Sequence, residues 1–213
     1  QLTSVNVAGP RAIQVVWDGS AFRGLLAGSG TDLKLLDFGS NISNTTPSVS
    51  TIAATAGVEF PGISLARDTS GWHCWVSNFP TADLRRFSFG NSLANAPTST
   101  SFGWPDGSGT PIAGDEILSA GIGITLFQED TTWYAVGVSY FESELYRIRL
   151  GPTLAADTSD LQASNLGVIA NDGSRRHAIA MHPYQGIPQA FFIERTNFSE
   201  IFRVPFSGAR HAS

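Results

Sequence analysis

The sequence contains very little cysteine, lysine or charge. Cys74 is the only cysteine among 213 residues, so no internal disulfide and no zinc site built from cysteines can form. Lys34 is the only lysine, and charged residues make up 15% of the chain, against about 25% in an average soluble domain. The net charge of −5 argues against a nucleic-acid surface dominated by phosphate contacts. No run of 18 apolar residues occurs, so we expect no membrane insertion.

Helical periodicity is also missing, and an internal repeat takes its place. Four segments share one pattern. Each opens with an acidic residue followed by Leu or Ile, and each ends with two apolar residues that are separated by one residue and followed by Gly or Ser. They are Asp32–Gly39, Asp83–Gly90, Glu144–Gly151 and Glu200–Ser207. Counted from Leu33, the steps between them are 51, 61 and 56 residues.

A second pattern, small-Ile-x-aliphatic, repeats with nearly the same steps of 50, 61 and 55 residues. It occurs at Ala12–Val15, Gly62–Leu65, Gly123–Leu126 and Ala178–Met181. Each copy is followed by a turn, an aromatic and β-branched stretch and then the acid-Leu segment. Final strands are expected near Ser48–Ala54, Thr98–Trp104 and Leu161–Ile169. The repeat therefore predicts four strands per unit of about 50 residues.

Such units are typical of β-propeller blades, and a β-sandwich is the main structural alternative. We predict a single all-β domain, a propeller of four blades with four antiparallel strands each. The predicted blades cover residues 10–54, 61–104, 115–169 and 175–206 plus 1–8. The fourth unit lacks a last strand, so we expect the N-terminal strand Leu2–Val7 to complete it and close the ring. Because the chain opens on Gln1 and Met181 is its only methionine, we expect a processed product or a piece of a longer protein.

The second repeat carries a resemblance to a known group of proteins. Its segment Leu84–Thr98 reads LRRFSFGNSLANAPT. It resembles a repeat of large bacterial surface proteins that reads Leu-x-Arg-Leu-Asp-Phe-Gly-Asn-Ser-Leu-Ser-Asn-Thr-Pro and follows a strand with a Trp-Tyr pair. Trp133-Tyr134 and Leu36–Gly39 fit the same pattern. The resemblance implies a propeller of an adhesin or cell-surface module, or of a phage virion, and it implies no catalytic residue.

Function in a repeat protein is expected where the repeat breaks, and the longest break is Pro105–Glu116. In an up-and-down blade this insertion emerges on the same face as the loops between the second and third strands, where binding residues concentrate. Its apolar and acidic residues suit a protein or glycan contact. The predicted binding residues are Trp104, Asp106, Ile112, Asp115 and Glu116. The Asp106-x-Ser108-x-Thr110 spacing suggests calcium only faintly, because Ile117 stands where the bidentate Glu is needed.

Other candidate residues favour structural roles. The acids that recur at the start of the third strands could form a ring of carboxylates, but a residue repeated in every blade indicates scaffold. His73 and Cys74 are adjacent on a strand and point to opposite faces, so they cannot form a nucleophile pair, and one exposed side is expected there. Trp72, Trp75 and Trp133 are expected in the core, whereas Trp17 is expected at an exposed edge. We expect no catalytic residue, no metal and no cofactor.

These observations favour a non-enzymatic structural or adhesive propeller of a virion or cell surface, located outside the cell. Its expected partners are other structural proteins of the same assembly and host glycans. A lectin-like sugar-binding propeller is one alternative. A metal-assisted hydrolase or lyase that uses the propeller channel is another, although the residues that begin the first strands (Arg11, Pro61, Ile122 and His177) are a poor catalytic set.

Overall fold

The computed structural model describes most of the strands and the turns at one end of the blades. The described residues are 5, 9–28, 32–54, 59–79, 84–102, 113–114, 121–139, 144–168, 176–184, 187–194 and 201–205. The five predicted binding residues, Trp104, Asp106, Ile112, Asp115 and Glu116, lie outside these ranges.

The first two units each form a four-stranded antiparallel sheet in sequence order. The first consists of β1 (Pro10–Trp17), β2 (Phe22–Gly28), β3 (Asp32–Gly39) and β4 (Ser48–Ala54). The second consists of β5 (Glu59–Asp68), β6 (Gly71–Phe79), β7 (Leu84–Gly90) and β8 (Thr98–Phe102). Both follow the strand pattern that the sequence predicts.

The third and fourth units repeat this order with two differences. The third contains β10 (Gly121–Glu129), β11 (Thr132–Ser139), β12 (Glu144–Gly151) and β13 (Gln162–Val168), with a short 3₁₀ turn, η1 (Thr158–Asp160), before β13. A two-residue strand, β9 (Ala113–Gly114), pairs parallel with β13 and adds a fifth strand. Within the described residues, the fourth sheet has three strands: β14 (Arg176–Tyr184), β15 (Ile187–Glu194) and β16 (Ile201–Pro205).

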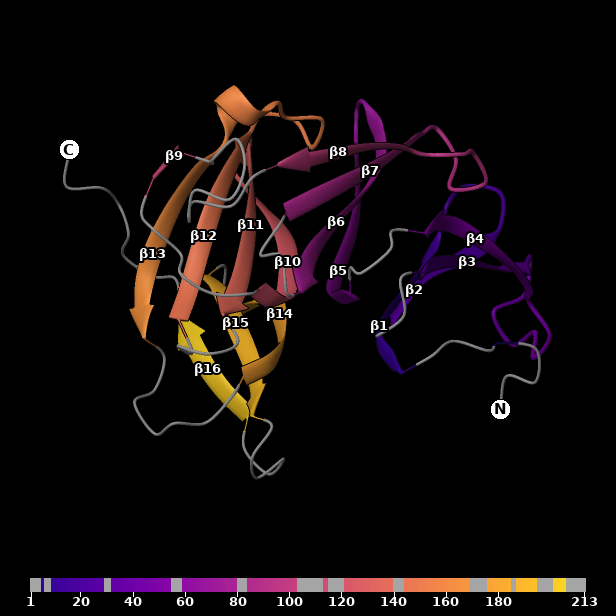
Figure 1. The fold of residues 1–213 in the computed structure, drawn as a ribbon, viewed down its shortest axis with the longest axis horizontal. Coiled ribbons are helices and arrows are strands. Elements are labelled where there is room, and N and C mark those ends of the chain that lie inside the picture. The colour runs from indigo at the N-terminus through magenta and orange to yellow at the C-terminus, as the bar shows by residue number, and fades with distance from the viewer. Residues whose placement is uncertain are drawn as a thin grey trace.

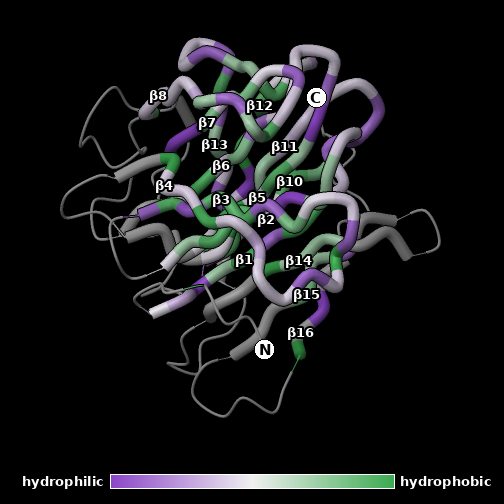
Figure 2. The backbone as a smooth tube through the Cα atoms, turned by 90° about the vertical axis from the view of Figure 1, so that its right-hand side faces the viewer, coloured by the Kyte–Doolittle hydropathy of each residue, from purple (hydrophilic) through white to green (hydrophobic). Residues whose placement is uncertain are grey.

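The sheets are arranged as the blades of a propeller around their first strands (Figure 1). Contacts join β1 to β5, β5 to β10 and β10 to β14, so the innermost strand of each blade touches that of the next. Hydrophobic segments run through the middle of the molecule, where the blades meet (Figure 2). The prediction of an all-β propeller with four blades is therefore confirmed.

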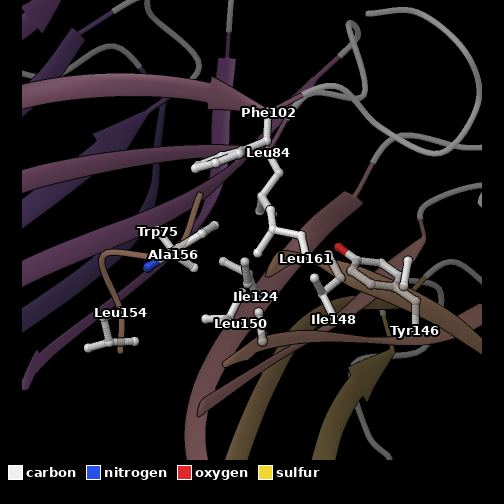
Figure 3. Close-up of a cluster of buried hydrophobic side chains, with 12 residues drawn as sticks. Trp75, Leu84, Phe102, Ile124, Tyr146, Ile148, Leu150, Leu154, Ala156 and Leu161 are labelled. Atoms are coloured by element: carbon white, nitrogen blue, oxygen red, sulfur yellow. The ribbon is translucent and has the colours of Figure 1, made fainter. Parts of the chain in front are cut away.

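Two apolar clusters fill the spaces between neighbouring blades. One joins the first two blades and includes Leu25, Leu35, Ile63, Cys74 and Phe89. The other joins the second and third blades; in Figure 3, Trp75, Leu84 and Phe102 face the side chains of the third blade. The rings of Trp75 and Phe102 stack with centroids 5.1 Å apart, and the Arg86 guanidinium lies over both. These clusters hold each blade against the next.

The apolar position before the turn that ends each third strand is buried, as the sequence predicts. Phe38, Phe89 and Leu150 expose 6%, 2% and 0% of their surface, whereas Phe206 lies outside the described residues. The glycine that follows each of them, at Gly39, Gly90 and Gly151, has a φ of +68°, +67° and +94°. Glycine adopts this left-handed conformation without the steric cost that other residues incur, which explains why it recurs in the repeat.

Closure of the ring by the N-terminal strand stays a prediction. Val5 is the only described residue of Leu2–Val7, and it packs against Leu26, Leu36 and Phe38 of the first blade. The other residues of this strand lie outside the described ranges.

The burial of Phe89 leads to a stability prediction. Phe89→Ala should lower the free energy of unfolding by about 3–5 kcal/mol, because it opens a cavity between two blades. Leu166→Ala is the control, since this leucine is 41% exposed and its truncation should cost under about 1 kcal/mol. Chemical denaturation of both variants measures the difference, and equal losses would contradict the assignment of Phe89 to the core.

Candidate functional site

The innermost strands of all four blades line one cavity of about 360 Å³ on the propeller axis. Its wall is the repeated small-Ile-x-aliphatic segment of each blade. The lining residues are Ile13, Gln14, Ile63, Ser64, Leu65, Ile124, Thr125, Leu126, Ile179, Ala180 and Met181. The motif detected in the sequence is therefore the wall of the propeller channel.

The polar position of this motif joins the first blade to the second and the second to the third. The side-chain amide of Gln14 donates to the Leu65 carbonyl at 3.0 Å, and its oxygen accepts from the Leu65 amide at 2.8 Å. One blade further on, the Ser64 hydroxyl accepts from the Leu126 amide at 2.9 Å. Because the inner strands are sheet edges, their outward backbone groups need partners, and these side chains provide them.

A buried carboxylate makes a second connection at the turn between the first two strands of a blade. Asp18 accepts hydrogen bonds within its own turn from the amide and hydroxyl of Ser20. It also accepts from the next blade, from the Ser92 hydroxyl at 2.9 Å and the Leu93 amide at 3.3 Å. Asp68 repeats this arrangement: it bonds Ser70 in its own turn and accepts from the Leu154 amide of the third blade. We call these two connections, together with those of Gln14 and Ser64, the interblade latches.

Hydrogen bonding keeps the latch carboxylates ionised. Burial alone would raise the pKa of Asp18, but the hydrogen bonds from Ser20, Ala21 and Ser92 outweigh it and hold the pKa well below its usual range. Asp18 also forms an ion pair with Arg23. Burial likewise tends to raise the pKa of Asp68, and the bonds from Ser70 and Leu154, with the nearby His73, lower it below the usual value.

His73 occupies the place in the second blade that Arg23 occupies in the first. Its Nε2 lies 2.8 Å from the Ser70 hydroxyl, and its Nδ1 lies 3.0 Å from the Ser88 hydroxyl. Burial lowers the pKa of His73; Asp68 opposes this change and Arg86 adds to it. The ring is only 2% exposed and Cys74 is fully buried, so the expectation of one exposed side at this pair is wrong. Both faces are covered because a neighbouring blade packs on each.

The described part of the channel wall carries hydroxyl and amide groups but no acidic or basic side chain. Its polar side chains are those of Gln14, Ser64 and Thr125, and none of the lining residues is acidic or a histidine. In the part of the chain that the structure describes, no group of three acidic, histidine or cysteine side chains could hold a metal ion. The same part contains no helix long and apolar enough to cross a membrane.

Acidic residues stand at the end of the blades where the first and third strands begin. The pairing of Pro10 with Gly28 and of Ala27 with Leu33 places these strand starts at the same end of the sheet. Glu59 begins the channel strand β5, and Asp32 and Glu144 begin the third strands β3 and β12. Asp32 is paired with Lys34 at 2.8 Å, in agreement with a structural role for the recurrent acids.

Part of the insertion lies elsewhere than the sequence predicts. Ala113 and Gly114 pair with Gln162 and Ala163, the first two residues of β13. Gln162 also pairs with Arg149 near the end of β12, which places it far from Glu144, where β12 begins. The expectation that the insertion shares a face with the loop before β12 is therefore wrong for these two residues, because they extend the outer edge of the third blade instead. Trp104, Asp106, Ile112, Asp115 and Glu116 lie outside the described residues.

The tryptophans follow the predictions from the sequence. Trp72 and Trp75 are buried, Trp133 packs partly buried against the cluster shared by the second and third blades, and Trp17 is 47% exposed. Sequence analysis missed the interblade latches. A signal for them exists, because Asp18 and Asp68 both stand five residues after the isoleucine of the motif, and Gln14 and Ser64 both stand at its variable position.

Solved structures that resemble this chain are named as an endo-arabinanase, a hydrolase and a β-xylosidase. An endo-arabinanase of family GH43 from Bacillus licheniformis superposes with a TM-score of 0.54, at 10% identity, over 92% of this chain and 73% of the arabinanase. A hydrolase from Bacteroides ovatus (TM-score 0.48, 11% identity, 87% of this chain and 54% of the other) and the RS223 β-xylosidase (0.29, 9%, 87% and 85%) superpose less well. No protein-family model and no curated protein matches the sequence. The propeller assignment rests on the arabinanase.

This comparison corrects the functional prediction from the sequence. The solved structure that resembles the chain with a TM-score above 0.5 is named as an endo-arabinanase of family GH43, so the prediction of a non-enzymatic structural or adhesive module is wrong. The propeller part of the resemblance to bacterial surface repeats is supported, whereas its virion and adhesin setting is not. At 10% identity the likeness itself establishes the fold.

The latch carboxylates should make stability depend on pH in the acid range. Because folding lowers the pKa of Asp18 and Asp68, their stabilisation is present above about pH 4, where unfolded aspartates ionise, and is lost as the pH falls through the lower folded values. Asp18→Asn should therefore reduce the fall in Tm between about pH 5 and pH 2 and cost about 1–3 kcal/mol at pH 7.

Asp32→Asn is the matched control, because it removes an acid from a partly exposed pair with Lys34 and not from an interblade latch. Differential scanning calorimetry across this pH range measures both variants. His73 is present in both, so its titration cancels in the comparison. If Tm falls equally steeply with decreasing pH in Asp18→Asn and in the parent chain, the role assigned to Asp18 is wrong.

Proposed function

We propose that this chain is a carbohydrate-active propeller that hydrolyses glycosidic bonds in a polysaccharide. The observation that carries the proposal is the superposition on the endo-arabinanase over 92% of the chain. A second support is the axial cavity, which is bordered by hydroxyl and amide side chains suited to sugar hydroxyls. An arabinan or a related pentose polymer is the substrate class that we infer.

Hydrolysis of a glycosidic bond needs two carboxyl groups, one that protonates the leaving oxygen and one that acts as base or nucleophile. Since the described channel wall has none, we place them at the channel end where the first strands begin. Glu59, the first residue of β5, stands at this end. Asp115 directly follows Gly114, which pairs with Ala163 at the outer edge of the third blade, so Asp115 and Glu116 are not assigned to this carboxyl pair.

We retain the predicted insertion as a glycan-binding element within this proposal. Trp104 offers an aromatic face for a sugar ring, and Asp106 offers oxygen acceptors for sugar hydroxyls. A polysaccharide substrate also fits the extracellular location that the sequence predicts. In this proposal the chain's partner is a glycan and not a nucleic acid or a membrane.

The test is release of reducing sugar from arabinan, arabinoxylan and xylan by the purified chain. Glu59→Gln should lower kcat/KM by at least about a hundredfold if Glu59 is the acid or the base, without lowering Tm. Glu129→Gln is the matched control, because Glu129 is exposed at the opposite end of β10 and should keep full activity. The absence of sugar release from all three polymers by a folded chain would refute the proposal.

A further inference from the structure

The face that each blade presents to its predecessor is covered in the second and third blades and only partly covered in the first. The motif isoleucines Ile63 and Ile124 are 8% and 4% exposed, whereas the equivalent Ile13 is 52% exposed. Leu93 and Leu154, three residues after the turn glycine, are fully buried, whereas the equivalent Ile42 is 53% exposed. The first blade therefore carries the same apolar face as its two neighbours without the same cover.

The exposed part of this face coincides with the place where the interblade latches attach. On the second and third blades, latch carboxylates bond the amides of Leu93 and Leu154, and channel side chains bond the amides of Leu65 and Leu126. The equivalent amides on the first blade are those of Ile42 and Val15. Trp17, 47% exposed, packs edge-on against Phe22 on the same face. Val5 covers the part of the face formed by Leu26, Leu36 and Phe38.

We propose that Ile13, Trp17 and Ile42 form the docking surface for a further four-stranded blade of this repeat type. The latches define the chemistry of that blade: an Asp at its first turn for the Ile42 amide, and a Gln or Ser at its motif position for the Val15 amide. The fourth blade of this chain has Tyr184 and Ala180 at these two positions, so it offers neither latch. The occupant that we infer carries both latch residues, which the fourth blade of this chain or of a second copy lacks.

This inference is independent of the proposed hydrolase activity, because it concerns how the propeller is completed. It continues an interface that the molecule already uses twice. Residues 9–58 span one repeat, since Ile13 and Ile63 are 50 positions apart. A second copy of this segment placed before Gly9 would put the latch residues of the added blade in register with the open face.

The experiment compares the parent chain with a variant that carries this duplicated segment. The amides of Ile42 and Val15 in the original first blade should exchange hydrogen at least about tenfold more slowly in the variant, and Trp17 of that blade should be less accessible to iodide. Replacement of the Trp17 copy in the added blade by Phe keeps the number of tryptophans at five, and the same variant with Trp17→Phe in the original blade gives the background from the other four.

Asp18→Asn in the added blade should abolish most of this protection, because it removes the latch to Ile42. Asp32→Asn in the added blade is the matched control, since Asp32 pairs with Lys34 of its own blade, and it should leave the protection intact. Unchanged exchange at Ile42, or protection that is equally strong in both variants, would overturn the proposed docking chemistry.

Sedimentation equilibrium of the parent chain tests the competing occupant, a second copy. The proposal predicts a monomer at micromolar concentration. A dimer that Ile42→Asp dissociates, while Leu166→Asp leaves it intact, would show that a second copy covers the face and would overturn the proposal.

Discussion

The packing of this propeller depends on one constraint: the inner strand of a blade is a sheet edge, and in the second and third blades its outward amide is paired by a side chain of the preceding blade. Gln14 and Ser64 meet this need along the channel, and Asp18 and Asp68 meet a similar need at the turns. An unsatisfied buried amide costs about 1–3 kcal/mol, so the latches fix the register between blades that apolar packing alone would leave loose. The interblade clusters then add the larger, non-directional part of the stability.

The strand order and the channel wall could be predicted from the sequence because two patterns recur with matching steps. The strand Ser48–Ala54 was predicted with the bounds that the structure has. The latches could not be derived, because Asp18 looks like an ordinary turn residue and its partner Leu93 is 75 positions away. Burial of His73 was missed for the same reason, since its cover is supplied by a neighbouring blade. Sequence spacing also could not show that Ala113–Gly114 follows the outer edge of the third blade.

Function was harder to predict than fold because the repeat elements that are easiest to recognise are those that build the ring. The channel motif supplies Gln14, Ser64 and Thr125, whose amide and hydroxyl groups form hydrogen bonds but are neither acids nor bases at neutral pH. The proposed hydrolysis therefore relies on residues outside the repeat pattern. This division of roles agrees with the general behaviour of propellers, in which one architecture supports unrelated activities.

Native-state hydrogen exchange at the latch amides tests the structural account most directly. If the latches fix the blades, the latch amides exchange only through global unfolding and share one free energy of opening. These amides are those of Leu65, Leu93, Leu126 and Leu154. Asp68→Asn should then release the Leu154 amide into faster local exchange and leave Leu93 protected. Exchange of these four amides at the rate of exposed turns in the unmodified chain would contradict the account.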